Sequence, residues 1–349
     1  MRNRNIISKI QERMERRDVL KLFGAAGAAT LVNSGMSKPT KAQGGKVTIR
    51  VATVQQNTQE PYLVLRRWGD EVEARSGGDI TVLVSGTEAV TGGERDALEG
   101  VRALGVYDAC SITSSLLSTV EPRYGISDLP FIFKDRETAF KYHDGEIGAK
   151  LDAMLLQTSG LRPLMHTYSL MRHTHLRSTS IRSLADFEGL KIRSVQADIP
   201  LRMFAALGAN AVPMAATEVY TSIQTGAIDG WECPLDAALA WKTYEVAKHT
   251  SLTGHQYADV VLCISEAFFQ KLSDEHQAIL VDTANDLLAD HRERMGALDK
   301  AAIAELEGHG ATVTEIDDKA PFQEAVASIY EDLGSRLGIL DIIEEVRAL

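Results

Sequence analysis

The run of residues 189–234 constrains the fold more than any other part of this chain. A β-strand is expected at 190–195 and another at 227–231, because both are short apolar segments next to turn-forming residues. Two helices are expected between them, one opening near Pro200 and one capped by Thr217. The order strand, helix, helix, strand predicts an α/β protein.

Arg193 stands near the carboxyl end of the first of these strands. Ligands of open α/β sheets bind outside the carboxyl ends of the strands. A guanidinium group there presents a planar fork of donors that fits a carboxylate in bidentate fashion. The residues alone leave two interpretations open, a contact with an acidic ligand or an ion pair with a neighbouring acid.

The rest of the chain repeats the alternation of strands and helices. Strands are expected at 46–54, 80–84, 107–112, 161–168, 257–264 and 311–316. Helical patterns separate most of them, which predicts mostly parallel sheets. A helix capped by Ser273 is expected to reach Leu306, and at 1.5 Å per residue it would be roughly 50 Å long, more than the width of one domain. We therefore expect it to span two lobes.

Several segments, in order, resemble the solute-binding proteins of TRAP (tripartite ATP-independent periplasmic) transporters, the DctP-like family. They read RSGGDITV, GGERDALEGV, DLPFIFKDRETA, GLKIR, ALGANAVPM, EVYTSIQTGAIDG, WECP and LTGHQYADVVLCIS. The resemblance covers the chain from about Val47 to Leu280. It implies an α/β, two-lobed, periplasmic binding protein-like fold of the class II type with a cleft between lobes. The implied lobes are 43–169 plus 257–297, and 170–256 plus 298–349.

The resemblance also implies the site. The arginine of KIR, Arg193, would hold the ligand carboxylate, and Arg172 would support it. Trp231, Glu232 and Cys233 would lie on the pocket strand, although many relatives carry an amide where Cys233 stands. Polar pocket positions of sialic-acid-binding relatives correspond to Glu94 and Thr113, and Ala216 replaces their Phe. The alternatives are ordinary core packing for Trp231, a first-turn helix acid for Glu94 and a solvated charge for Glu232.

The N-terminus differs in kind from the rest. Residues 1–42 combine a basic segment, Arg16-Arg17, the apolar run 22–32 and small residues at 40–42. This pattern is typical of a twin-arginine export signal, with Glu15 and Val19 departing from it. The alternative is an N-terminal extension. The segment carries a net charge of +6 and the whole chain −11, so the remaining 307 residues carry −17. A protein with this net negative charge repels nucleic acid and anionic membranes.

Catalytic and metal signatures are not found. The three cysteines lack CxxC spacing, and no P-loop, Rossmann, Gly-x-Ser-x-Gly or His-Glu-x-x-His pattern occurs. His173-x-His175 places two imidazoles on one strand face without a third ligand nearby, so we interpret it as structural. We expect no cofactor and no metal.

The prediction is a periplasmic, non-catalytic protein that captures a small organic acid between closing lobes and delivers it to TRAP membrane permease subunits. We expect a monomer, with a dimer as the alternative. Two other functions stay open at this point. One is a ligand-binding module for a chemoreceptor or sensor kinase, and the other is an exported enzyme on a two-lobed scaffold. The sequence does not name the carboxylate.

Overall fold

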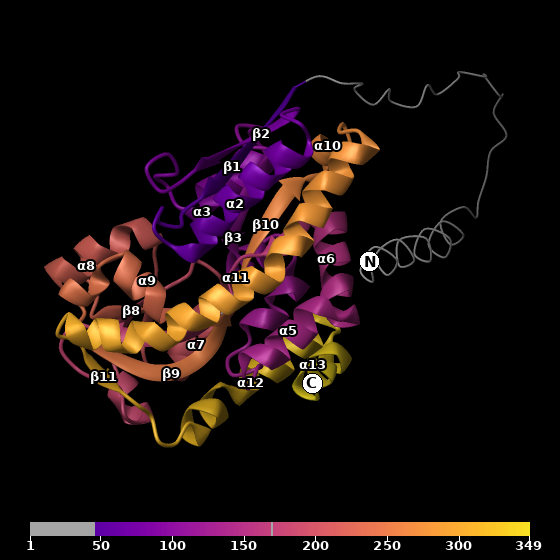
Figure 1. Cartoon of the computed structure of the whole chain (residues 1–349). Coiled ribbons are helices and arrows are strands. Elements are labelled where there is room, and N and C mark those ends of the chain that lie inside the picture. Colours follow the sequence, from indigo (N-terminus) through magenta and orange to yellow (C-terminus); the bar gives the residue numbers. More distant parts are fainter. Residues whose placement is uncertain (1–45, 169) are drawn as a thin grey trace, which may run out of the picture.

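The computed structural model describes residues 46–168 and 170–349, and it forms two lobes, each built around one β-sheet (Figure 1). The predicted export signal at 1–42 lies outside the described residues. The first lobe has a five-stranded sheet in the order β2 (Ile80–Ser85), β1 (Val47–Thr53), β3 (Ala109–Thr113), β10 (Val260–Ser265) and β4 (Leu161–His166). The second has the order β11 (Thr312–Thr314), β9 (His249–Ala258), β5 (Leu170–Leu176), β8 (Gly230–Cys233), β6 (Lys191–Ser194) and β7 (Asn210–Pro213).

Both sheets are mixed, with more parallel than antiparallel pairings, within the expected two-lobed α/β fold. Of the pairings among the described strands, five are parallel and four antiparallel. The antiparallel pairs all involve β10 or β5. These strands follow a passage of the chain from one lobe to the other, and such a strand enters its new sheet from the opposite end.

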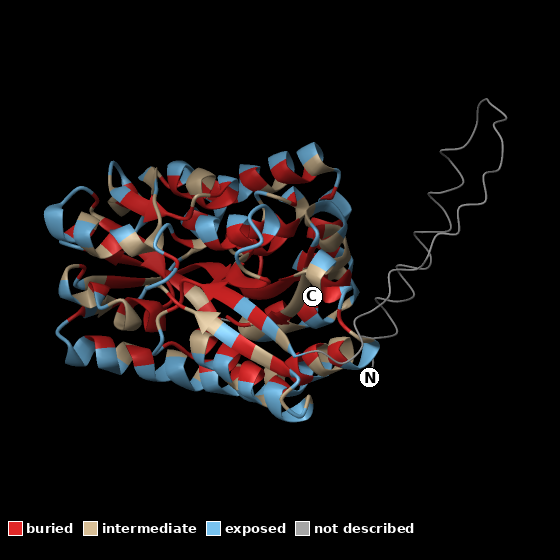
Figure 2. Cartoon of the chain, turned by 90° about the horizontal axis from the view of Figure 1, so that it is seen from above, coloured by how far each residue is buried: buried red, intermediate tan, exposed pale blue. Residues whose placement is uncertain are grey.

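The first sheet is buried on both faces because its apolar residues alternate between two clusters. Ala109 packs in one cluster with Trp68 of α2 (Glu60–Arg75), whereas its neighbour Cys110 packs in the other with Leu98 of α3 (Glu94–Arg102). Figure 2 shows buried residues along the central strands and exposed residues on the outer faces of the helices. Cys110, Cys233 and Cys263 are buried free thiols.

Two of the passages of the chain between the sheets lie next to each other. It leaves the first sheet after β4 and enters the second at β5, and it returns at Asp259, between β9 and β10. The two passages are held together because the Thr167 N–H donates to the Val260 carbonyl at 2.6 Å. Tyr257, near which the chain is expected to return, pairs with Met171 in the second sheet. The division of the remaining segments between lobes stays a prediction.

The predicted long helix is confirmed as α11 (Asp274–Gly308), 35 residues long. Ser273 caps it, accepting a hydrogen bond from the His276 N–H at 3.1 Å. Its N-terminal half packs on the first lobe, where Leu280 joins the cluster of Trp68, and its C-terminal half packs on the second, where Leu306 joins the cluster of Trp231. Figure 1 shows it running along both lobes. None of the helices in the described part of the chain is long and apolar enough to cross a membrane.

The other helices flank the sheets. They are α4 (Ser114–Leu117), α5 (Arg136–Asp144), α6 (Glu146–Ser159), α7 (Asp198–Ala206), α8 (Val219–Thr225), α9 (Leu235–Ala240), α10 (Glu266–Phe269), α12 (Ala320–Leu337) and α13 (Leu340–Arg347). The helix expected from Thr217 begins two residues later, at Val219, because a single 3-10 turn occupies residues 216–218. The expected arrangement of 189–234 is otherwise confirmed, with one further strand, β7, between α7 and α8.

Candidate functional site

A pocket lies between the two sheets. The first lobe contributes the ends of β1 and β3 and the start of α3, and the second contributes β5, β6 and β8 with the segments that follow them. It is lined by Val54, Gln55, Glu94, Thr113, Tyr168, Arg172, Arg193, Val195, Ala216, Trp231, Cys233, Pro234, Ala237, Trp241, Ala258 and Val260. Six of the seven predicted site residues are among them, and their contact with a ligand stays a prediction.

Arg193 is a cation of the pocket that keeps hydrogen-bond donors available for a ligand. It lies near the carboxyl end of β6 and is 6% exposed. Its Nε donates to the Met214 carbonyl at 2.9 Å, which fixes the plane of the guanidinium. The two terminal nitrogens have no hydrogen-bond partner among the described residues, and burial lowers the pKa of the side chain. A buried guanidinium with an unused fork is a site for an anion with two oxygens.

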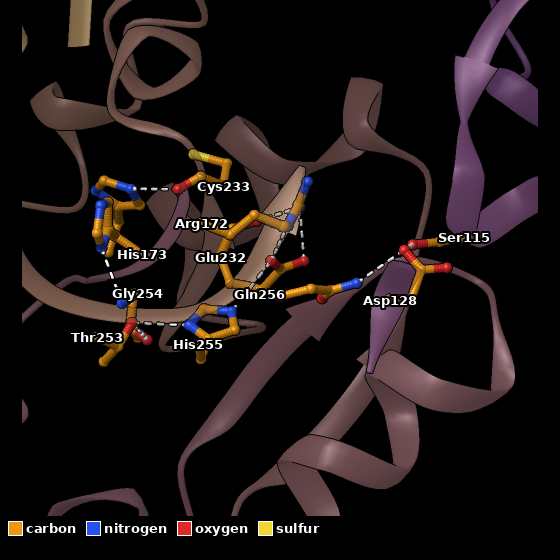
Figure 3. A network of polar contacts seen from close by, with 12 residues as sticks. Ser115, Asp128, Arg172, His173, Glu232, Cys233, Thr253, Gly254, His255 and Gln256 are labelled. Carbon is orange, nitrogen blue, oxygen red and sulfur yellow. Dashed lines mark hydrogen bonds and ion pairs between the residues drawn. The ribbon is translucent and has the colours of Figure 1, made fainter. Parts of the chain in front are cut away.

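Arg172, by contrast, is already paired. Its Nη2 donates to Glu232 Oε1 at 2.8 Å and to the Glu232 carbonyl at 2.9 Å, and its Nε donates to Glu232 Oε2 (Figure 3). Burial alone would raise the pKa of Glu232, but the charge and hydrogen bonds of Arg172, together with His255, outweigh it and lower that pKa to about 2. The same pairing raises the pKa of Arg172 against the effect of burial. The pair is a closed, neutral unit.

Glu232 is not among the residues that line the pocket, and its contact with a ligand stays a prediction. Its carboxylate lies against Arg172 and His255, whose Nε2 is 3.5 Å from Oε2 (Figure 3). The alternative of a solvated charge is wrong, because Glu232 is 0% exposed. Strand pleating explains this: Trp231 and Cys233 point to one face of β8 and Glu232 to the other.

The first lobe presents an acceptor to the pocket. Glu94 opens α3, and Thr113 ends β3. The Thr113 N–H donates to Glu94 Oε1 at 3.0 Å and the Thr113 hydroxyl donates to Oε2 at 2.8 Å. Burial raises the pKa of Glu94, and the bonds from Thr113 partly oppose this. The carboxylate is thus held in place at the edge of the pocket.

An apolar wall completes the pocket. Trp231 is buried, and its indole N–H donates to the Thr243 hydroxyl at 3.1 Å, which fixes the ring. Cys233 and Trp241 also face the pocket. Burial raises the pKa of the Cys233 thiol well above its usual value, so the group acts as a small apolar surface.

Comparison with known proteins now decides the family. Residues 51–336 match the family model DctP, described as bacterial extracellular solute-binding protein, family 7. The chain belongs to this family. It is accordingly a periplasmic solute-binding protein of the TRAP type and not an enzyme.

Two solved structures and one curated relative illustrate the likeness. A TRAP periplasmic solute-binding protein from Xanthobacter autotrophicus Py2 with bound β-D-galacturonate is 34% identical, with a TM-score of 0.81 over 86% of this chain and 99% of that one. One from Polaromonas sp. JS666 bound to D-erythronate is 30% identical, with a TM-score of 0.82 over 87% and 99%. The 2,3-diketo-L-gulonate-binding periplasmic protein YiaO of Escherichia coli is 29% identical, over 79% of this chain and 83% of its own.

Some pocket residues of this solute-binding protein were not predicted. Tyr168 and Trp241 line the pocket, and so does Gln55. Tyr168 precedes the Met-Arg-His segment and Trp241 follows the pocket strand by eight residues, so proximity in sequence was the available signal. Tyr168 donates its hydroxyl hydrogen bond to Asp236, a contact that no sequence pattern indicates.

His173 and His175 make structural contacts. His173 Nδ1 accepts from the Gly254 N–H at 3.0 Å (Figure 3). The ring nitrogens of His175 lie 3.0 Å from the Thr250 hydroxyl and 3.2 Å from the Cys233 carbonyl. These protein partners occupy both ring nitrogens of His175 and the Nδ1 atom of His173.

Proposed function

We propose that this protein binds a sugar acid with one carboxylate and several hydroxyls, and delivers it to a TRAP membrane permease. The observation that carries the proposal is the unused fork of Arg193, which faces a pocket whose opposite side holds the Glu94 carboxylate. A carboxylate would bond to the fork. A hydroxyl group at the other end of the ligand would donate to Glu94, an acceptor that a second carboxylate could not satisfy.

The hydrogen-bonding states of the two arginines favour one carboxylate on the ligand. Arg172 is paired with Glu232 before any ligand enters, whereas the terminal nitrogens of Arg193 have no hydrogen-bond partner among the described residues. A monoanion would pair with Arg193. A dianion would bring a second charge into a buried site near Glu94, where desolvation is costly.

The relatives support the same class. β-D-galacturonate, D-erythronate and 2,3-diketo-L-gulonate, bound by the three relatives above, each have a single carboxylate and several oxygen substituents. The apolar wall of Trp231 and Trp241 suits the C–H face of such a ligand. Ala216 lines the pocket without filling it, which leaves room for a ring.

The remaining parts of the proposal concern location and partners. We propose that residues 1–42 direct export by the twin-arginine route and that the mature protein acts as a monomer. The basic leader and the arginine pair support the first statement. The permease would receive the ligand when the lobes open.

Three ligands with the same configuration at C2 to C5 and different charges test the proposal. They are D-galactose, D-galacturonate and galactarate, with zero, one and two carboxylates; galactarate is also acyclic. We expect D-galacturonate to bind, and the other two to bind at least tenfold more weakly, in isothermal titration calorimetry. At a concentration of about 100 times its Kd, the monoacid should add about 2.7 kcal/mol to the free energy of unfolding.

A wider thermal-shift screen tests separately the preference for one carboxylate and the role of Arg193. It would contain aldonates, uronates, C4 dicarboxylates and neutral sugars. Stabilisation by monocarboxylic sugar acids supports the proposal in full. A preference for dicarboxylates refutes the charge argument, and stabilisation by neutral sugars alone refutes the role of Arg193.

A further inference from the structure

A second cluster of polar side chains, none of which lines the ligand pocket, lies where the chain passes between the lobes. Among the described residues, His143, His166 and Asp259 each bring one nitrogen or oxygen atom into a group whose members all lie within 4.8 Å of one another. His166 ends β4, Asp259 joins β9 to β10, and His143 lies in the last turn of α5. Three segments far apart in sequence therefore converge there.

Two polar atoms of this cluster are buried without a partner. They are His143 Nε2 and Asp259 Oδ2, which lie 3.9 Å from each other. The side chains are 4% and 0% exposed. Leaving such groups unpaired costs free energy, and most buried polar groups in native proteins have a partner. The two atoms are too far apart to form a hydrogen bond with each other.

We propose that His143, His166 and Asp259 form a binding site for a divalent transition-metal ion of the Zn²⁺ class. Two imidazoles and one carboxylate are a usual donor set for zinc, with water in the fourth position. A tetrahedral site with metal–ligand distances near 2.1 Å has about 3.4 Å between ligand atoms. The distances from Asp259 oxygens to His166 Nδ1 and His143 Nε2, 2.8 and 3.9 Å, bracket that value.

The charges around the cluster suit a cation. Arg292, a cation close to the site, donates two hydrogen bonds to the Asp144 carboxylate, at 2.7 and 2.8 Å. Asp152 of α6 adds a further negative charge near His166.

The surroundings fix the ligands and leave a way in. The rings of Tyr142 and Tyr257 lie 4.7 and 6.0 Å from the ring of His143 and limit its movement. The Asp259 carbonyl accepts from the Ser114 N–H at 2.9 Å, which holds the junction of β9 and β10. The His166 side chain is 15% exposed, so an ion can reach the cluster from that side. A bound ion would tie α5 to both passages between the lobes.

Titration of the tag-free protein with ZnSO₄ tests the proposal. After dialysis against EDTA and removal of the chelator, we expect one ion per chain with a Kd below 10 µM. His143→Gln and Asp259→Asn should each weaken binding at least tenfold. His309→Gln, a change at an exposed histidine on the far end of α11, serves as the matched control and should leave it unchanged.

A second measurement does not depend on whether the variants fold. The zinc K-edge absorption spectrum of the loaded parent protein should show two imidazole ligands and oxygen neighbours. Absence of saturable binding overturns the proposal. So does binding that both variants retain, or a spectrum without imidazole, because either result means that the ion sits on surface carboxylates.

Discussion

Arg193 and Arg172 line the same pocket but are in different electrostatic states. Arg172 gives its donors to Glu232, whereas Arg193 uses only Nε within the protein. The family resemblance predicted that both contact the ligand. We therefore expect different roles for the two residues. Arg193 binds the ligand carboxylate, and Arg172, whose charge is neutralised by Glu232, forms a rigid part of the pocket wall.

The first prediction concerns the shape of the Arg193 side chain. Arg193→Lys keeps the charge but loses the planar fork, so it should weaken binding of D-galacturonate at least tenfold. Arg193→Ala should cost more, about 2–5 kcal/mol of binding free energy. Isothermal titration calorimetry measures both. Arg202→Lys, on the exposed side of α7, is the matched control. Equal affinity of the Lys variant and the parent would show that no bidentate contact exists.

The second prediction concerns Glu232 and acid. Its pKa is about 2 in the folded protein, below the ordinary value of 4.5. The unfolded chain therefore binds the proton more readily, and stability is lost as the pH falls from about 4.5 toward 2. The shift corresponds to a contribution of about 3 kcal/mol at neutral pH.

Glu232→Gln should remove this dependence. The variant should have a lower free energy of unfolding at pH 7, since it leaves Arg172 buried and unpaired, and a shallower loss of stability below pH 4.5. Urea unfolding at pH 7, 5, 4 and 3 measures this. Glu305→Gln, at an exposed position of α11, should behave like the parent. A parallel pH curve for Glu232→Gln would mean that other carboxylates control acid unfolding.

At the scale of elements, local patterns predicted what local forces determine. The cap Ser273 and the absence of proline and glycine up to Gly296 predicted α11, and the alternation of apolar residues predicted β1 and β2. The turn residues around β6 placed Arg193 at the end of its strand. Each of these features depends on neighbours within a few residues.

Features that depend on distant residues were not predictable in the same way. The pairing of β10 with β3 and β4 is antiparallel because the chain returns from the other lobe, and no pattern in 260–265 records that direction. The partner of Glu232 is Arg172, 60 residues away. The cluster of His143, His166 and Asp259 likewise joins segments whose proximity only the fold establishes.

At the scale of the whole molecule, ligand binding depends on both lobes. Both lobes contribute to the pocket, so a ligand that touches Arg193 and Glu94 together favours the closed form over the open one. The lobes also meet beside the pocket. A Cβ atom added at Gly93, next to Glu94, would lie 3.1 Å from the Ala215 Cβ. A side chain larger than alanine at position 215 would therefore meet the backbone of the other lobe.

Ala215→Phe tests whether closure supplies the binding energy. The ring needs space that only an open arrangement provides, so it should weaken D-galacturonate binding at least tenfold while leaving Arg193 intact. Small-angle X-ray scattering should show the parent becoming more compact with ligand and the variant remaining extended. Ala205→Phe, on the exposed face of α7, controls for added apolar surface. If Ala215→Phe binds as tightly as the parent, the pocket forms without contact between the lobes, and Arg193 must hold the ligand from one lobe alone.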